Sequence, residues 1–222
     1  DTNYLEAYKS IDGLQEEGLN TYLLPMLKAW LLAGQNKNDA ALRIIDKKTS
    51  NAGLQTLYGI QGAMISEFGN NTKDAIVRYN RVAKLQKNVN LRVTILLGAL
   101  YERLGQNVNA KQIYDNYRDL HPGTTKLDRA YNRLKAAEKP EPNNQTVSDG
   151  VAEALFSLGF AIQNQDPYQA IIFSRLAIYL RPSFTIAKLL LAGSLEDNDK
   201  LKEANNIYHS MSKDPNYSWA TR

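Results

Sequence analysis

The sequence predicts an all-α fold made of repeated antiparallel helix pairs. Apolar residues recur at helical spacing along most of the 222 residues, and strand-like alternation is nearly absent. A set of small, aromatic and proline positions also recurs at steps close to 35 residues. A stretch rich in Pro, Asn and Ser interrupts that recurrence between residues 123 and 150. Together these observations predict a helical array on each side of a linker.

The first helix of each predicted pair carries small residues and ends at a turn. The N-terminal variant is "PMLKAWLLAGQN", in which Trp30 takes the aromatic place and Gly34 the turn. "LYGIQGAMISEFG" and "ILLGALYERLGQ" follow, and in the latter Gly98 lies three residues before Tyr101 and seven before Gly105. "ALFSLGFAIQNQD" repeats the pattern after the linker. Small residues at these places let the two helices of a pair approach closely.

The second helix of a pair is clearest in "AKQIYDNYRDLHPG". Ala110, Tyr114, Tyr117 and Pro122 follow one another there at intervals of four, three and five residues. The same intervals recur in residues 170–182, "AIIFSRLAIYLRP", and weaker copies lie in "AIVRYNRVAKLQK" and "LKEANNIYHSMSKDP". The proline ends the helix because it disfavours helical geometry in the residue before it.

These spacings resemble those of the tetratricopeptide repeat (TPR) family, whose unit of roughly 34 residues is two antiparallel helices. Successive second helices open at Ala40, Ala75, Ala110, Ala170 or Ile171, and Ala204, at steps of 35, 35, about 60 and 34 residues. The resemblance covers most of the chain and implies an all-α, right-handed superhelical solenoid of TPR-like helix pairs, with a register break near 123–150. Residues 152–182 are also similar to TPR proteins of the alphaproteobacterial cell envelope.

Three segments are expected along the chain. Residues 1–139 form an N-terminal TPR-like helical array that includes an extra amphipathic helix at about 125–138, "TKLDRAYNRLKAAEK". Residues 140–149 form a linker, and residues 150–222 form a C-terminal TPR-like module. The closing "YSWATR" resembles the first turn of a further helix, and the chain opens in mid-pattern. We therefore expect a truncated C-terminal module from a longer repeat protein.

The composition is that of an ordinary folded chain. Hydrophobic residues make up 43% and the mean hydropathy is −0.44, and no apolar run is long enough to span a bilayer. The absence of cysteine excludes disulfides and fits either the cytoplasm or the periplasm. The cell-envelope resemblance favours the periplasm. A net charge of +4 does not by itself indicate a nucleic-acid partner.

The residues needed for catalysis are missing from the pattern. His121 and His209 are the two histidines, and neither has an adjacent Ser or Cys nucleophile with a matching acid. His121 is interpreted as the residue that precedes the helix-ending Pro122. The acidic cluster "EDNDK" lacks calcium-loop spacing, and no glycine-rich phosphate loop occurs. The expectation is a protein that is not an enzyme, with no cofactor and no metal.

The TPR resemblance implies that the first helix of each pair lines a concave groove that binds another protein or a peptide segment. The residues mapped to that face are Ile95, Ala99, Glu102, Arg103, Glu153, Phe156, Phe160, Gln163 and Leu189. Phe156 and Phe160 lie one turn apart and are candidate apolar anchors, with the charged residues setting the register. An equally weighted alternative is that the two phenylalanines pack against the predicted helix at 126–138.

A basic row supports a second hypothesis. Arg78, Arg81, Lys84 and Lys87 recur at every third residue between Lys73 and Arg92. This row is either a solvated convex face or a site for an anionic partner, namely an acidic protein, a lipid or a nucleic acid. Nucleic acid is the least expected of these, and the identity of the partner and the oligomeric state stay open.

Overall fold

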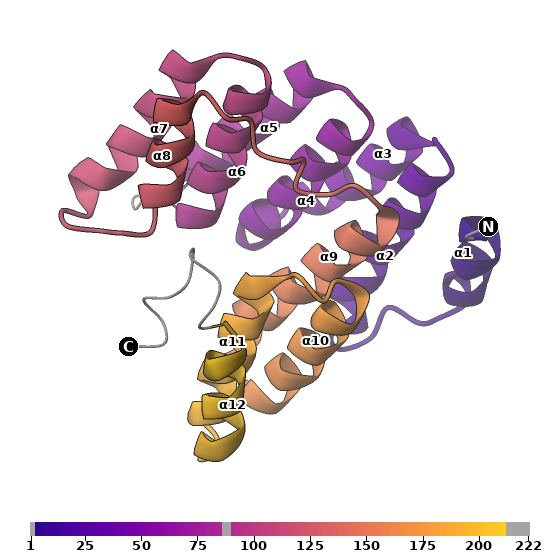
Figure 1. Ribbon diagram of the computed structural model, residues 1–222. Helices are drawn as coiled ribbons and strands as arrows, with labels where there is room; N and C mark the ends of the chain where they lie inside the picture. Colours follow the sequence, from indigo (N-terminus) through magenta and orange to yellow (C-terminus); the bar gives the residue numbers. More distant parts are fainter. Residues whose placement is uncertain (1–2, 86–89, 212–222) are drawn as a thin grey trace. The chain divides into compact units, whose positions relative to one another are not determined.

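The structure is a computed structural model that describes residues 3–85 and 90–211 (Figure 1). The described residues form twelve α-helices and one short 3₁₀ helix (Ala52–Leu54) and contain no strand, which confirms the all-α prediction. The helices are α1 (Tyr4–Asp12), α2 (Asn20–Gly34), α3 (Asn38–Thr49), α4 (Gln55–Phe68), α5 (Thr72–Leu85), α6 (Leu91–Arg103), α7 (Asn107–Leu120), α8 (Asp128–Ala136), α9 (Val147–Ile162), α10 (Pro167–Leu180), α11 (Thr185–Glu196) and α12 (Leu201–Met211). None of the described helices is both long enough and apolar enough to cross a bilayer. The turn expected in "YSWATR" and Lys87 of the basic row lie outside the described residues.

Several helices begin at side chains that cap their first turn. The Asn90 side chain accepts hydrogen bonds from the first backbone N–H groups of α6. Thr146 and Asp149 form a capping box at the start of α9, each side chain bonding the backbone N–H of the other. Asp166 caps α10, and Pro167 occupies the first turn, where a missing N–H costs nothing. The polar residues before these helices therefore fix where each one starts.

Four helix pairs share one turn geometry. Asn36, Asn70, Gly105 and Asp199 have positive φ angles of 60°, 61°, 73° and 58°. They lie between α2 and α3, α4 and α5, α6 and α7, and α11 and α12. The left-handed region is accessible to glycine and tolerated by asparagine and aspartate, which explains the residue types. In the pairs α4–α5, α6–α7 and α11–α12, the two helices that such a turn joins pack against each other.

The helices group into two compact units. Unit 1 comprises residues 1–31 and 146–222, and unit 2 comprises residues 32–145. This grouping differs from the expected division at residues 140–149, because the first 31 residues belong with α9–α12. Trp30 and Gly150 account for the difference: the Trp30 side chain is fully buried, and a Cβ at Gly150 would lie 2.2 Å from its ring. Glycine is thus the residue that lets α2 pack on α9.

In unit 2 each helix packs against the next one along the chain, from α3 to α8, and α8 also contacts α6. A Cβ added at Gly98 would lie 2.2 Å from the buried ring of Tyr114. The close approach of α6 and α7 expected from Gly98 is therefore confirmed. Helix α8 lies within residues 125–138, where an extra helix was expected, and Leu127 and Ala130 bury its apolar side against α7.

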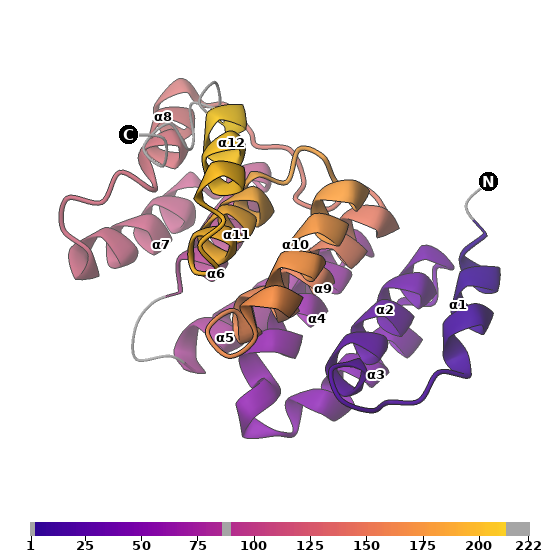
Figure 2. The same ribbon diagram turned by 90° about the horizontal axis from the view of Figure 1, so that it is seen from below.

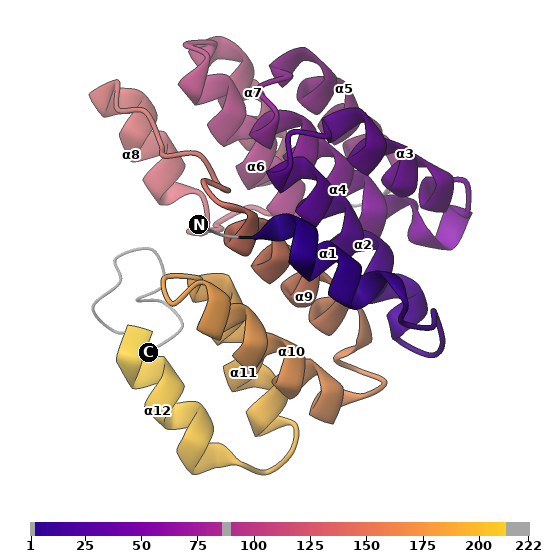
Figure 3. The ribbon, with the colours of Figure 1, turned by 90° about the vertical axis from the view of Figure 1, so that its right-hand side faces the viewer.

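Unit 1 continues the same packing from α9 through α10 and α11 to α12 (Figure 3). The Ser148 hydroxyl donates to the Leu180 carbonyl at 3.2 Å and ties the start of α9 to the end of α10. Helix α1 lies beside α2 (Figure 2), where the Lys28 ammonium pairs with the Asp12 carboxylate at 3.0 Å. The predicted linker is shorter than expected, since α9 already begins at Val147.

Candidate functional site

The residues predicted to line the groove fall into two sets, one in each unit. Ile95, Glu102 and Arg103 belong to unit 2, on α6. Glu153, Phe156 and Phe160 on α9 belong to unit 1, together with Gln163 and Leu189. Each set is described within its own unit.

Glu102 lies inside unit 2 and is only 2% exposed. The Tyr114 hydroxyl donates to its carboxylate at 2.6 Å, and Arg133 donates to it from Nε at 3.0 Å and from Nη2 at 2.8 Å. Burial and the hydrogen bond to Glu102 raise the pKa of Tyr114 well above its ordinary value. Glu102 thus joins α6, α7 and α8, and its carboxylate already accepts hydrogen bonds from Tyr114 and Arg133.

The same arrangement occurs 35 residues earlier, around Glu67. The Tyr79 hydroxyl donates to the Glu67 carboxylate at 3.3 Å, and Arg103 forms an ion pair with it. Burial raises the pKa of Glu67, while the Arg103 charge and the hydrogen bond from Tyr79 oppose this shift. Unit 2 therefore contains two Glu–Tyr–Arg clusters, in which a first helix supplies Glu, the second Tyr and a later helix Arg.

Residues 140–145, here called the strap, run from the end of α8 back toward α4 (Figure 1). The strap is not helical, and its two prolines disfavour helical geometry in the residues before them.

Three side chains of α4 and α6 contact the strap. Arg103 Nη1 donates to the Glu141 carbonyl at 3.4 Å, and Arg92 Nη2 donates to Asn143 Oδ1 at 3.2 Å. The Asn143 side-chain amide also donates from Nδ2 to Met64 Sδ at 3.7 Å. The face of unit 2 that carries Arg103 is thus covered in part by the chain itself.

Ile95 is half-buried in unit 2. It packs against the core cluster that contains Tyr114, Tyr117 and Leu127. Its contacts stabilise α6 on α7, and a part of the side chain remains accessible.

Glu153 in unit 1 is also buried, with 1% of the residue exposed. Arg181 Nη1 lies 3.3 Å from its carboxylate, and Arg181 Nε lies 3.7 Å from that of Asp149. Arg181 follows the last residue of α10, so these contacts hold the end of α10 against α9. Glu153 therefore serves the packing of unit 1 in this structure.

The two phenylalanines of α9 differ in their surroundings. Phe156 is buried, and its ring centroid lies 5.3 Å from that of Phe184 before α11 and 6.0 Å from that of Phe160. Phe160 is 56% exposed. Gln163 lies next to it and donates from Nε2 to the Phe160 carbonyl at 3.2 Å. Phe160 is thus an exposed ring backed by buried aromatic contacts.

Leu189, the last residue mapped to the groove, lies on α11 and is partly exposed. Its side chain therefore stays accessible at the surface of unit 1.

One residue of the basic row, Arg78, forms ion pairs with carboxylates of unit 2. Arg78 binds both carboxylate oxygens of Asp46 at 2.5 and 3.0 Å and Asp74 at 2.6 Å. Burial favours the neutral form of Asp74, but hydrogen bonds from Ser66 and Arg78 outweigh it and lower the pKa of Asp74. Arg81 is exposed, as is Lys84. An anion would therefore meet a shorter row than the sequence suggests.

Two surfaces were not identified from the sequence. One is the contact of Met64 and Arg92 with the strap, although Met64 lies 35 residues before Ala99, a place already mapped to the groove. The other is a row of large exposed apolar side chains on α10. That row consists of Tyr168, Ile172, Leu176 and Tyr179. Its spacing follows one helix face, which the helix-pair pattern had assigned to no role.

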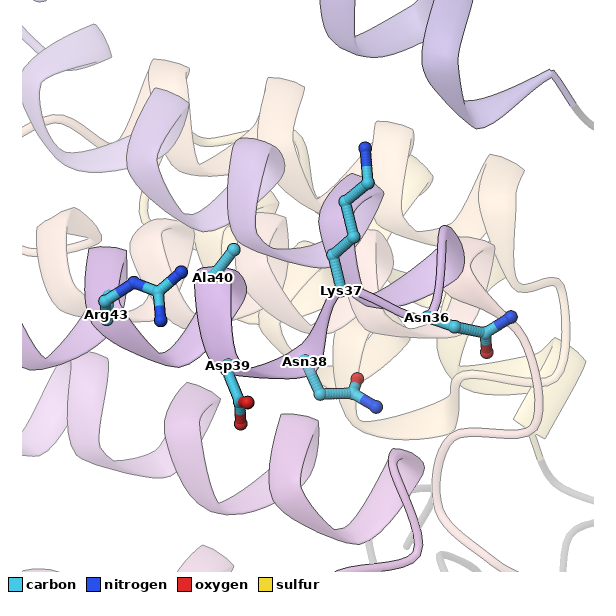
Figure 4. Close-up of a pocket in the computed structure, with 6 residues that line it drawn as sticks. All are labelled: Asn36, Lys37, Asn38, Asp39, Ala40 and Arg43. Atoms are coloured by element: carbon cyan, nitrogen blue, oxygen red, sulfur yellow. The ribbon is translucent and has the colours of Figure 1, made fainter.

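A shallow polar pocket lies at the turn between α2 and α3 (Figure 4). It is lined by Asn36, Lys37, Asn38, Asp39, Ala40 and Arg43. The charged side chains of Lys37 and Asp39 point in different directions and do not converge on one point. The pocket therefore offers no common centre for a small ligand.

His121 follows the last residue of α7, as expected for a residue before Pro122. Its ring packs on that of Tyr117, with centroids 4.3 Å apart. Within residues 3–85 and 90–211, no three His, Asp or Glu side chains gather as metal ligands would.

Comparison with protein-family models found no match for this chain, and comparison with curated proteins found none either.

Proposed function

We propose that this chain is a TPR-like array of helix pairs that works as a non-catalytic scaffold and binds a segment of another protein. Two regularities support the proposal. Left-handed turn residues recur at Asn36, Asn70 and Gly105, at intervals of 34 and 35 residues. The Glu and Tyr members of the two Glu–Tyr–Arg clusters recur at an interval of 35 residues. A right-handed superhelical arrangement of the pairs is part of the same proposal.

The exposure of Phe160 is the observation that carries the binding role. A large apolar ring costs free energy when it faces water, and here it lies beside the buried ring of Phe156, which in turn packs on Phe184. A ring held in this way loses little conformational freedom when a partner covers it. Phe160 is therefore the proposed anchor, with Gln163 and Leu189 as accessible residues of the same unit.

Affinity capture with the Phe160→Ala variant tests this role. We expect the variant to retain the helical content of the native chain and to recover several-fold less of the partner, because the truncated residue supplied the apolar contact. The measurement is quantitative mass spectrometry of co-purified proteins, with circular dichroism to check the fold. Phe156→Ala is unsuitable for this purpose because Phe156 is buried.

Tyr179→Ala is the matched control, since Tyr179 is an exposed aromatic residue on α10 of the same unit. We expect capture by this variant to equal that of the native chain. Capture that depends on Tyr179 and is indifferent to Phe160 would move the binding surface to α10 and contradict the proposal.

A further inference from the structure

The strap contacts unit 2 in the way that a bound peptide contacts a protein. Its backbone carbonyl at Glu141 accepts from Arg103, and the Asn143 carboxamide accepts from Arg92. The Asn144 side chain is buried, and its Oδ1 accepts from Asn143 Nδ2 at 2.9 Å. Side chains of unit 2 thus hydrogen-bond to a backbone carbonyl and to a side-chain amide of a non-helical segment, as they would in peptide recognition.

The position of the strap is as informative as its contacts. Met64 and Arg103 come from the first helices of two successive pairs, α4 and α6, and the strap contacts both. The TPR resemblance implies that Arg103 and Ala99 line the groove, and Met64 lies 35 residues before Ala99. The chain therefore occupies, with its own residues, the face on which a partner was expected.

We infer that the face of α4 and α6 is a binding site for a non-helical peptide that contains proline and asparagine, and that the strap occupies this site in place of a partner. The inference rests on the proposed scaffold function and adds its regulation. Hydrogen bonds at 3.2 and 3.4 Å help to hold the strap on this face, and its prolines limit its other conformations. A tethered segment of this kind competes at an effective concentration on the order of millimolar. A partner gains access to this face when the strap leaves it.

The direct test uses the strap itself as a probe. A fluorescent peptide of residues 138–147, "EKPEPNNQTV", is titrated against the native chain and against an opened variant. The opened variant carries alternating Gly and Ser in place of residues 140–145, so the chain length is unchanged. We expect saturable binding to the opened variant and binding at least about tenfold weaker to the native chain, where the tethered strap competes.

Two controls define the chemistry. A probe with Asn143→Ala and Asn144→Ala should lose most of its binding to the opened variant. Should the opened variant fail to fold by circular dichroism, Asn143→Ala in the full chain opens the strap more mildly, because it removes three hydrogen-bonding contacts and keeps both prolines. That variant should bind the probe more tightly than the native chain does.

Equal binding to the native and opened chains would overturn the inference, as would no binding to either opened form at millimolar peptide. Equal binding of the native probe and of the probe that lacks the two asparagines would overturn it as well. These outcomes are separate from the Phe160 test. If Phe160→Ala loses capture and the probe does not bind, the scaffold role is supported and the strap site is rejected. If the probe binds and Phe160→Ala captures as much partner as the native chain, the proposed anchor in unit 1 is rejected.

Discussion

Two glycines, Gly98 and Gly150, allow close packing of helices against aromatic rings. Gly98 leaves room for the Tyr114 ring in unit 2, and Gly150 leaves room for the Trp30 ring in unit 1. In both places an added Cβ would lie 2.2 Å from aromatic carbon, which is far inside van der Waals contact. Both rings are buried, so neither can turn away without disturbing its neighbours. Glycine is required at these two positions because the aromatic ring fills the space that a side chain would occupy.

Gly98→Ala should lower the free energy of unfolding by about 1–3 kcal/mol, as overpacking of a filled core does. The Tyr114 ring would have to move, and its hydrogen bond to Glu102 would weaken. Urea denaturation followed by circular dichroism measures the change.

Gly193→Ala on α11 is the matched control. No atom lies within 4 Å of the Cβ it would add, so the substitution should stabilise the helix by up to about 1 kcal/mol. If both substitutions shifted stability in the same direction, packing at Gly98 would not be the reason for glycine there.

At the scale of elements, α8 illustrates how a short helix is held in place. Nine residues are too few for a stable isolated helix, so its order depends on packing. Arg133 reaches the buried Glu102, and the Tyr131 hydroxyl donates to Asp115 at 2.7 Å. Partial burial and this hydrogen bond raise the pKa of Tyr131 to about 12. The Arg118 guanidinium lies over the Tyr131 ring, 3.6 Å from its centroid.

Arg133→Met should destabilise unit 2 by about 3–5 kcal/mol, because it leaves the Glu102 carboxylate buried without its cationic partner. The double variant Glu102→Leu with Arg133→Met should recover part of the loss, since it removes both charges. Thermal and urea unfolding of the single and double variants measure the coupling.

Arg175→Met provides the comparison, because the Arg175–Glu203 pair is exposed on both sides. Its effect should stay within about 1 kcal/mol. A cost for Arg133→Met no larger than that for Arg175→Met would show that the buried cluster does not hold α8.

At the scale of the whole molecule, the sequence predicted the helices better than the environments of the charged residues. Local signals located the helix end before Pro122, the turn at Gly105 and the extra helix that became α8. Glu102 and Glu153 were expected in the concave groove, because the TPR resemblance implies that the first helix of each pair lines it. Both are buried, since Arg133 and Arg181 reach them from positions 31 and 28 residues later.

The grouping of the chain into two units also depends on distant residues. Trp30 packs at Gly150, which lies 120 residues later, and neither residue carries a local signal of the other. The strap was recognised as a linker from its Pro and Asn content, but composition does not reveal what a linker contacts. The 35-residue step from Met64 to Ala99 is the sequence signal that could have placed the strap near the groove.

The central claim is that Phe160 anchors a partner segment on α9. Site-specific photo-cross-linking tests it most directly, with a photoreactive phenylalanine at position 160 in one variant and at position 179 on α10 in the other. The predicted result is cross-links from position 160 to one short segment of one partner, mapped by mass spectrometry, and none to that segment from position 179. Cross-links of equal yield from both positions, or cross-links to the partner from position 179 alone, would contradict the claim.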